Sequence, residues 1–197
     1  ETIKWNPWIE TGTPLPTPET STYLNTVGLF EGARYFSSGV YRPKQNCTMR
    51  ALGGPFCEIC QEALVWAVWD RVSPIDLALP AATSLQLEAC GSQHFEIASP
   101  GLNPNNLNIR WELDEQLLES GVPSIELSAS DLGEGSHTVR VTIEDLTDRV
   151  RRDPNALLQD SRNWTVQVSS PCGDDLFCNG MESCQGDLCV SDGEACA

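Results

Sequence analysis

Histidine, basic residues and long hydrophobic runs are all scarce in this 197-residue sequence. The two histidines, His94 and His137, have no ligand-type neighbour at a metal-binding spacing, and no H-E-x-x-H motif occurs. No Gly-x-Ser-x-Gly motif occurs either, so catalysis by an activated serine has no support. No apolar run approaches the roughly 18 residues that a membrane-spanning helix requires. The sequence therefore predicts no membrane span.

The shortage of basic residues leaves the chain strongly acidic. Twelve Lys and Arg face 28 Asp and Glu, which gives a formal net charge of −16. Such a charge repels phosphate backbones, so we expect no nucleic-acid partner. The acidic groups Asp174-Asp175 and Asp145, Asp148 and Asp153 lack the spacing of an EF-hand loop. Solvated carboxylates are the default interpretation, and calcium binding is the alternative.

An initiator methionine and a signal peptide are also absent, since the chain begins Glu1-Thr-Ile-Lys. We therefore expect an internal or C-terminal part of a longer protein.

Cysteine, in contrast, is abundant, with nine residues. Five of them fall in the Gly- and Asp-rich segment 171–197, at Cys172, Cys178, Cys184, Cys189 and Cys196. This density predicts a small module held by disulfides, in an oxidising extracellular compartment where the protein is secreted or held at the cell surface. Because nine is odd, either a partner cysteine lies outside this sequence or one thiol is free.

The N-terminal region is expected to be irregular at first. Prolines in the stretch Thr13–Pro18 exclude it from a helix interior, because each lacks a backbone donor and restricts its predecessor. We expect it to run extended over a surface, with Trp5 and Trp8 as packing anchors. Residues 26–56 are Gly-rich, with a short strand or turn at Val27–Ala33.

Residues 55–72 form the clearest helix. Pro55 suits the first helical position, and apolar residues follow the spacing i, i+3, i+4, i+7. Ser73-Pro74 ends the helix and marks a domain boundary. The apolar face is expected to pack on the preceding segment, and it comprises Phe56, Ile59, Cys60, Ala63, Leu64, Ala67 and Val68.

From residue 74 to residue 170 the hydrophobic period changes to two. Alternation is clearest at 107–113, 139–144 and 164–168, and shorter candidates occur at 75–79, 85–89, 95–98 and 124–128. About seven short strands separated by turn signals predict an Ig-like β-sandwich. Trp111 lies mid-strand, where a core tryptophan is expected. Residues 149–162 show no pattern and are expected to form a long loop.

Three cysteines before the sandwich admit several interpretations. Cys57-x-x-Cys60 at a helix start has the spacing of a redox pair or of half a zinc knuckle. A redox site of the thioredoxin kind would need a preceding strand, and a zinc knuckle would need a second pair, and neither is present. We therefore expect Cys47 to form a disulfide with Cys57 or Cys60. The remaining cysteine would pair with Cys90 or with a cysteine outside this sequence.

Several motifs of the first 72 residues occur in a characteristic order. They are Trp5-x-x-Trp8, Thr13-Pro-Leu-Pro-Thr-Pro18, Val27-Gly-Leu-Phe-Glu-Gly-Ala33, Tyr41-Arg-Pro43, Cys47-x-Met49 and Phe56-Cys-x-x-Cys60. This set resembles the C-terminal part of the IgA-peptidase family of zinc metallopeptidases, whose fold is similar to that of the metzincins. The resemblance implies that residues 1–73 are the end of an α/β metallopeptidase domain. The patterns described above give 74–170 as the sandwich and 171–197 as the disulfide-rich module.

The resemblance also implies roles for individual residues. Cys47 and Met49 look like the Met-turn that lies beneath the catalytic metal, and residues 57–71 look like the closing helix. A substrate-cleft wall would include Phe30, Glu31, Tyr35, Tyr41 and Arg42. In the family, a zinc-bound water attacks a peptide carbonyl while a glutamate takes the proton.

One departure from the family pattern decides what this chain can do alone. The zinc-binding helix is absent, so no zinc ligand and no catalytic base can be assigned here. We expect the parent protein to be a secreted zinc metalloendopeptidase that acts on a protein or peptide substrate, and this chain alone to be inactive. The alternative is a non-catalytic binding or adhesion module, because the sandwich and the cysteine-rich tail make up most of the chain.

Overall fold

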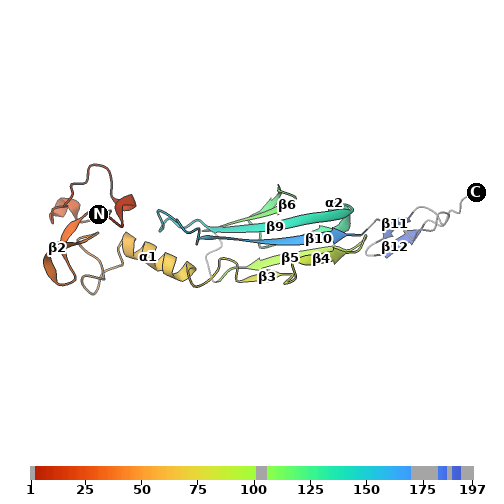
Figure 1. The fold of residues 1–197 in the computed structure, drawn as a ribbon, viewed down its shortest axis with the longest axis horizontal. Coiled ribbons are helices and arrows are strands. Elements are labelled where there is room, and N and C mark those ends of the chain that lie inside the picture. The colour runs from red at the N-terminus through yellow and green to blue at the C-terminus, as the bar shows by residue number, and fades with distance from the viewer. Residues whose placement is uncertain (1–2, 101–105, 170–181, 186–187, 192–197) are drawn as a thin grey trace, which may run out of the picture. The chain divides into compact units, whose positions relative to one another are not determined.

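The structure, a computed structural model, describes residues 3–100, 106–169, 182–185 and 188–191. The chain divides into two compact units: unit 1 contains residues 1–71 and 147–157, and unit 2 contains residues 72–146 and 158–197. Strands outnumber helices among the described residues (Figure 1). Within them, no helix has the length and apolar character needed to cross a membrane.

Unit 1 contains one α-helix, one hairpin and two short 3-10 helices. These elements are η1 (Asn6–Trp8), η2 (Ser21–Tyr23), β1 (Phe30–Ala33), β2 (Phe36–Arg42) and α1 (Glu58–Trp69). The hairpin turns at Arg34 and Tyr35, whose φ values of 51° and 69° suit the tight turns that match strand twist. The strand expected near Val27–Ala33 is thus β1. Its partner β2 was not expected, because its first four residues are all exposed and show no alternation.

Helix α1 forms where the apolar spacing predicts a helix, but it buries a different face. Glu62 and Trp69 are its buried residues. The expected packing of Leu64 and Val68 is wrong, since both side chains are about half exposed. Hydrogen bonds explain this orientation of α1. The buried Glu62 carboxylate accepts hydrogen bonds from Trp8 Nε1 and from the backbone N–H of Arg151, both at 2.7 Å. These bonds turn Glu62 inward and the aliphatic face outward.

The proline-rich stretch is held by hydrogen bonds as well as by packing. The backbone N–H of Thr17 donates to the carbonyl of Leu29 at 2.7 Å. The Thr17 Oγ1 accepts from Leu29 N at 2.8 Å and donates to Pro14 O at 2.7 Å. Trp5 Nε1 donates to the carbonyl of Gly28 at 2.7 Å. Both tryptophans therefore anchor this region, as expected, and their indole N–H groups contribute alongside their rings.

Unit 2 is a sandwich of two sheets. One has the strand order β4-β10-β9-β6-β7 and the other the order β3-β5-β8. All neighbours are antiparallel except β4 and β10, which run parallel. The strand bounds are β3 Leu77–Leu79, β4 Ser84–Leu87, β5 Ser92–Ala98, β6 Leu107–Leu113, β7 Gln116–Ser120, β8 Ser124–Ser128, β9 Gly135–Asp145 and β10 Gln159–Val168.

The core between the sheets follows the period-two pattern. Val139, Val141 and Ile143 of β9 are fully buried. Phe95 and Trp164 rings lie 5.2 Å apart edge to face, and Trp111 stacks on Trp164 at 5.9 Å. The seven expected strands and the core position of Trp111 are confirmed.

Two stretches of unit 2 depart from the expectation. Strand β7 was not predicted, because all five of its residues are exposed and it lies at a sheet edge. Residues 159–162, expected in a loop, begin β10 and pair with β9. Strand β7 and residues 159–162 form through backbone pairing, and neither stretch has a buried side chain, so hydrophobic period carries no signal there. A short helix, α2 (Ala129–Leu132), follows β8 and is capped reciprocally by Ser128 and Asp131.

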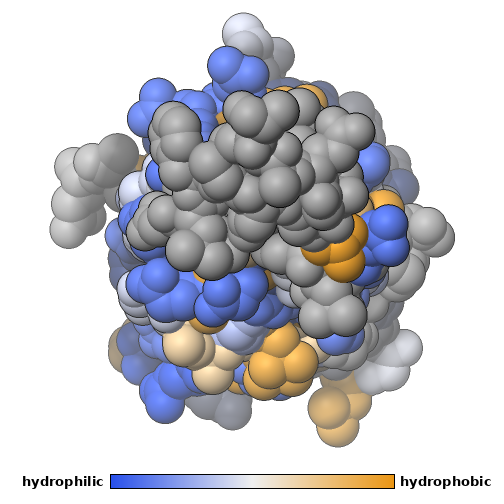
Figure 2. Space-filling view, turned by 90° about the vertical axis from the view of Figure 1, so that its right-hand side faces the viewer, coloured by the Kyte–Doolittle hydropathy of each residue, from blue (hydrophilic) through white to orange (hydrophobic). Residues whose placement is uncertain are grey.

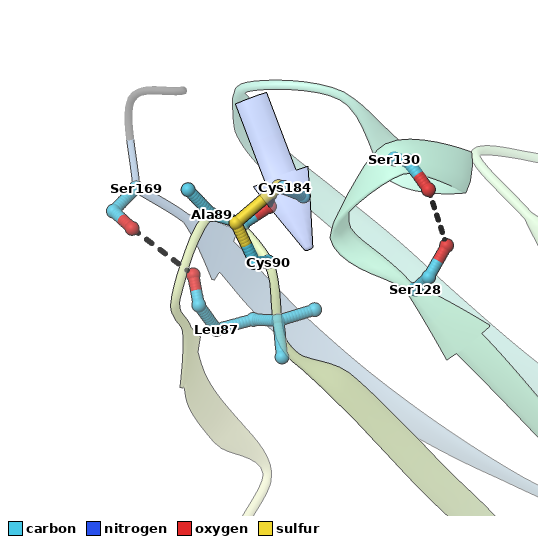
Figure 3. The surroundings of a disulfide bond; sticks show 7 residues. All are labelled: Leu87, Ala89, Cys90, Ser128, Ser130, Ser169 and Cys184. Atoms are coloured by element: carbon cyan, nitrogen blue, oxygen red, sulfur yellow. Dashed lines mark hydrogen bonds between the residues drawn. A yellow bond between two sulfur atoms is a disulfide. The ribbon is translucent and has the colours of Figure 1, made fainter. Parts of the chain in front are cut away.

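A disulfide joins the C-terminal segment to the sandwich. The hairpin of β11 (Glu182–Gln185) and β12 (Leu188–Ser191) contributes Cys184, which is bonded to Cys90 in the turn after β4 (Figure 3). Cys184 is a disulfide cysteine as predicted. Cys90, one of the two partners considered for the cysteine left over among Cys47, Cys57 and Cys60, is not that partner. The predictions for Cys172, Cys178 and Cys196, and for the side chain of Cys189, lie outside what the structure describes.

Hydrophilic residues predominate among the described residues on the face shown in Figure 2. The hydrophobic residues visible there stand in small groups, which is normal for a soluble surface. That view therefore gives no reason to place a binding site on the face it shows.

Candidate functional site

The turn at residues 47–50 forms as the sequence indicates. The carbonyl of Cys47 accepts the backbone N–H of Arg50 at 2.8 Å and that of Ala51 at 3.1 Å. The N–H of Thr48 donates to the carbonyl of Pro55 at 3.0 Å, which holds the turn against the segment before α1. Met49 is left 73% exposed. Its side chain is therefore available to a further part of the protein and does not pack within unit 1.

Three thiols meet beside this turn. Cys47 comes from the turn, Cys57 is the N-cap residue of α1, and Cys60 lies in the first turn of that helix. Cys60 Sγ is 3.6 Å from both Cys47 Sγ and Cys57 Sγ, and the three sulfurs all lie within 4.8 Å of one another. The structure has all three as free thiols. The predicted disulfide between Cys47 and Cys57 or Cys60 is therefore not what the structure contains.

The surroundings of the three sulfurs affect their pKa values differently. Burial raises the pKa of Cys60 to about 12, helped by the neighbouring thiols, and burial also raises the pKa of Cys57. Burial opposes ionisation of Cys47 too, but hydrogen bonds from the backbone N–H groups of Cys57 and Met49 outweigh it and lower the pKa of Cys47. Cys47 is thus the thiol of this group that ionises first.

A cavity of about 740 Å³ opens beside the thiols. It is lined by the hairpin, the turn and the start of α1, and the three cysteines and Met49 all border it. Arg42 is tied into its wall, since its Nη1 donates to the carbonyls of Glu31 and Gly32 and its guanidinium pairs with the Glu19 carboxylate. Lys44 pairs with Glu58 at the start of α1. The wall is therefore charged and braced by internal ion pairs.

The residues predicted for a substrate-cleft wall are only partly brought together. Glu31, Tyr35 and Arg42 line the cavity, and Tyr35 is fully exposed at the tip of the hairpin. Phe30 is fully buried, and Tyr41 is half-buried and does not line the cavity. Their role toward a substrate stays a prediction.

Glu19 is a contributor to the cavity wall that was not predicted from the sequence. It lies far from the cysteine turn in sequence, and only folding brings it to Arg42 in the wall. Nothing in its sequence context distinguishes it from the other acidic residues. The grouping of the three cysteines did have a sequence signal, namely the odd cysteine count together with the Cys57-x-x-Cys60 spacing.

The histidines and acidic groups do not form a metal site in the described part of the chain. His137 Nδ1 lies 2.8 Å from the Asp114 carboxylate and its Nε2 lies 3.1 Å from the carbonyl of Gly133, as a structural histidine does. Among the described residues, Cys47, Cys57 and Cys60 are the one group of three or more clustered ligand-type side chains. Asp145, Asp148 and Asp153 do not form such a group, and Asp174-Asp175 lie outside the described residues.

Comparison with known families finds one match, and it falls on this site. Residues 19–68 match the sequence profile of IgA Peptidase M64. All residues that line the cavity, from Glu19 to Cys60, lie inside the matched segment. No curated protein matches the chain.

Comparison with solved structures concerns fold alone. The fibronectin(III)-like modules of Clostridium thermocellum CbhA match with a TM-score of 0.33 and 11% identity, over 48% of this chain and 95% of theirs. The Bacteroides ovatus mixed-linkage glucan utilization locus protein SGBP-B, solved with a mixed-linkage heptasaccharide, matches with a TM-score of 0.34 and 19% identity, over 53% of this chain. The match covers only 24% of SGBP-B.

The residues present do not fit a catalytic zinc of this peptidase family. Such a site uses the two histidines of an H-E-x-x-H helix, whereas this sequence has no such motif and both its histidines are in unit 2. The clustered ligands in unit 1 are thiols, which are typical of structural zinc sites. No ligand of that catalytic zinc can therefore be assigned to a residue of this sequence.

Proposed function

We propose that unit 1 is the C-terminal part of the catalytic domain of a secreted zinc metalloendopeptidase, and that the zinc-binding helix belongs to a preceding segment. The observation that carries the proposal is the overlap between the family match at residues 19–68 and the residues that build the cavity. In the complete enzyme, the turn at Cys47 and Met49 forms the floor beneath the metal. The Glu31, Tyr35 and Arg42 side of the cavity then faces a protein or peptide substrate.

The exposed apolar side chains of unit 1 support this proposal. Tyr35, Phe36, Met49 and Leu52 are each more than half exposed, and Leu64 and Val68 on α1 are about half exposed. An apolar surface of this kind is normally covered by further protein. A preceding catalytic segment packed on the hairpin, the turn and the outer face of α1 would bury it.

A direct test compares this chain with its longer form. The coding sequence before Glu1 should encode an H-E-x-x-H helix within about one domain length. The extended protein should cleave a general protein substrate with zinc present and lose that activity when the motif's glutamate is changed to glutamine. The 197-residue chain should cleave nothing under the same conditions. An extended protein without that motif would overturn the proposal, as would cleavage by the chain alone.

A second candidate function concerns unit 2 by itself. Its sandwich has a complete aromatic core, and edge strand β7 exposes Leu117 and Leu118. An exposed edge strand can pair with an extended ligand, so this observation favours a binding or adhesion module. Binding of residues 72–197 to a panel of glycans and glycoproteins, compared with Leu117→Lys, tests it. If no ligand is retained, or if the variant retains a ligand equally well, β7 is not a binding edge.

The disulfide between Cys90 and Cys184 supports placing the protein outside the cytoplasm. Disulfides persist in oxidising compartments and are rare in reducing ones. Secretion or surface attachment is therefore part of the proposed function.

A further inference from the structure

The spacing of the three thiols suits a shared ligand better than a disulfide. A disulfide brings two sulfurs to about 2.05 Å. Two thiolates on one tetrahedral zinc ion, each about 2.3 Å from the metal, stand about 3.8 Å apart. Two of the Sγ–Sγ distances are 3.6 Å, and the third pair lies within 4.8 Å. Cys60 is equidistant from two neighbours, an arrangement that a single disulfide does not require.

We propose that Cys47, Cys57 and Cys60 form a zinc site with three thiolate ligands, distinct from the catalytic zinc of the peptidase family. Zinc is the natural ion because thiolates select soft or borderline metals. Three protein ligands would leave a fourth position for water, which could enter from the cavity of about 740 Å³ that all three cysteines border. This inference does not rest on the proposed function, since zinc uptake requires no peptidase activity.

The local backbone is arranged to support negative charge on sulfur. The N–H of Cys57 donates to Cys47 Sγ at 3.3 Å. Cys57 caps α1, and Cys60 lies in its first turn, where the helix dipole stabilises anions. A bound dication would supply the remaining stabilisation, and the three thiols would release their protons on binding.

The number of cysteines also fits this site. Cys90 and Cys184 pair with each other, and Cys47, Cys57 and Cys60 form the cluster. The other cysteines in the sequence are Cys172, Cys178, Cys189 and Cys196, an even number that can pair fully. A zinc site that uses three thiols therefore accounts for an odd total of nine without a partner from outside the sequence.

Unit 1 has a structural need for such a link. Its buried hydrophobic side chains, among the described residues, are Val27, Phe30, Cys57 and Trp69. A domain with so few core residues usually requires a disulfide or a metal to hold it. Zinc would fasten the Met49 turn directly to the start of α1.

Metal analysis of the full 197-residue chain tests the proposal. The chain is purified with a phosphine reductant, stripped of metal, equilibrated with zinc and dialysed, and its zinc is measured by mass spectrometry. We expect about one zinc per chain, lost in Cys60→Ser and in Cys47→Ser. Cobalt in place of zinc should give the intense thiolate charge-transfer absorption of a tetrahedral site. The double variant Cys90→Ser, Cys184→Ser is the matched control and should keep the metal.

A second measurement on the unaltered chain guards against variants that fail to fold. Zinc should slow alkylation of Cys47, Cys57 and Cys60 at least tenfold, as read by peptide mass spectrometry, and a chelator should restore it. Zinc uptake that survives Cys60→Ser would overturn the proposal. So would a disulfide among the three cysteines in protein purified without reductant, combined with no zinc uptake after reduction.

Discussion

Asp114 shows how one exposed carboxylate organises a turn. With Glu115 it forms the turn between β6 and β7, where both residues have positive φ. Its carboxylate accepts the N–H of Thr138 at 2.8 Å and contacts His137 Nδ1 at 2.8 Å. These two hydrogen bonds, the backbone one foremost, lower the pKa of Asp114 below its ordinary value of 3.8. The ionised form is therefore favoured by folding.

Asp114→Asn should remove a pH-dependent part of the stability of unit 2. Because the pKa of Asp114 is lowered in the folded state, the stabilisation is complete at pH values above the ordinary pKa. It is lost as the pH falls through the pKa of the folded state. We expect a loss below about 1 kcal/mol at about pH 6, since the side chain is half exposed, and none at about pH 2. Urea unfolding at both pH values measures it. Glu115→Gln is the control, and an equal loss at both pH values would contradict the prediction.

Gly28 is the residue at which a single added methyl should do most harm. A Cβ there would lie 2.9 Å from Thr17 Cβ and closer still to its Oγ1, the atom that pairs with Leu29 N and Pro14 O. Gly28→Ala should therefore destabilise unit 1 by about 1–3 kcal/mol.

Amide exchange of peptides that cover residues 14–30 measures the effect of Gly28→Ala. Gly54→Ala, where an added Cβ meets nothing within 4 Å, is the control. Unchanged protection of these peptides in Gly28→Ala would show that Thr17 can move aside.

At the scale of elements, α1 is oriented by a polar contact. The buried Glu62 accepts the indole N–H of Trp8 and the backbone N–H of Arg151, from segments far before and after it in the chain. Arg151 also lies over the Trp8 ring, 4.7 Å from its centroid. One carboxylate thus joins three segments of unit 1.

Glu62→Ala should cost unit 1 about 1–3 kcal/mol in total, because two part-buried donors lose their acceptor. Glu62→Gln should cost less, because its carbonyl oxygen still accepts one bond. Urea unfolding followed by amide exchange in α1 distinguishes the two variants, and exposed Glu10→Ala is the control. Equal stability of the three variants Glu62→Ala, Glu62→Gln and Glu10→Ala would show that Glu62 does not orient the helix.

Hydrophobic period explains which elements were predictable. In unit 2 each core strand has one buried face, so alternate residues such as Val139, Val141 and Ile143 are apolar and the strands are visible in the sequence. In α1 the same rule failed, because the apolar face of Leu64 and Val68 is not the buried one. The buried face of α1 depends on Glu62 and on hydrogen-bond donors that are distant in sequence, so a local sequence pattern cannot predict it.

The candidate site was predictable in part for a similar reason. The turn at Cys47–Arg50 and the helix that begins near Cys57 are local structures, so their positions follow from neighbouring residues. The meeting of three sulfurs and the ion pair of Arg42 with Glu19 join segments that are distant in sequence. Sequence spacing restricts such pairings but does not select among them.

For the whole molecule, the disulfide between Cys90 and Cys184 closes a loop that contains strands β5 to β10 of the sandwich, with a sequence separation of 94. The chain-entropy model gives about 4.7 kcal/mol for a loop of this size, and disulfides typically contribute about 2–4 kcal/mol. Cys90→Ser with Cys184→Ser should lower the stability of unit 2 by that amount.

Urea unfolding of unit 2 with and without reductant measures the stability that this disulfide contributes. Reductant should destabilise the natural chain toward the level of the double variant and leave the variant unchanged. A variant that reductant destabilises further would show that other disulfides carry the effect.

The sequence by itself determined the strands of the sandwich, the position of α1, the turn at Cys47 and the acidic surface. These depend on local propensity and on side-chain period, which neighbouring residues encode. Only the tertiary structure decided the buried face of α1, the pairing of Cys90 with Cys184 and the gathering of Cys47, Cys57 and Cys60. Each of these is a contact between distant segments, and its geometry exists only once the chain is folded.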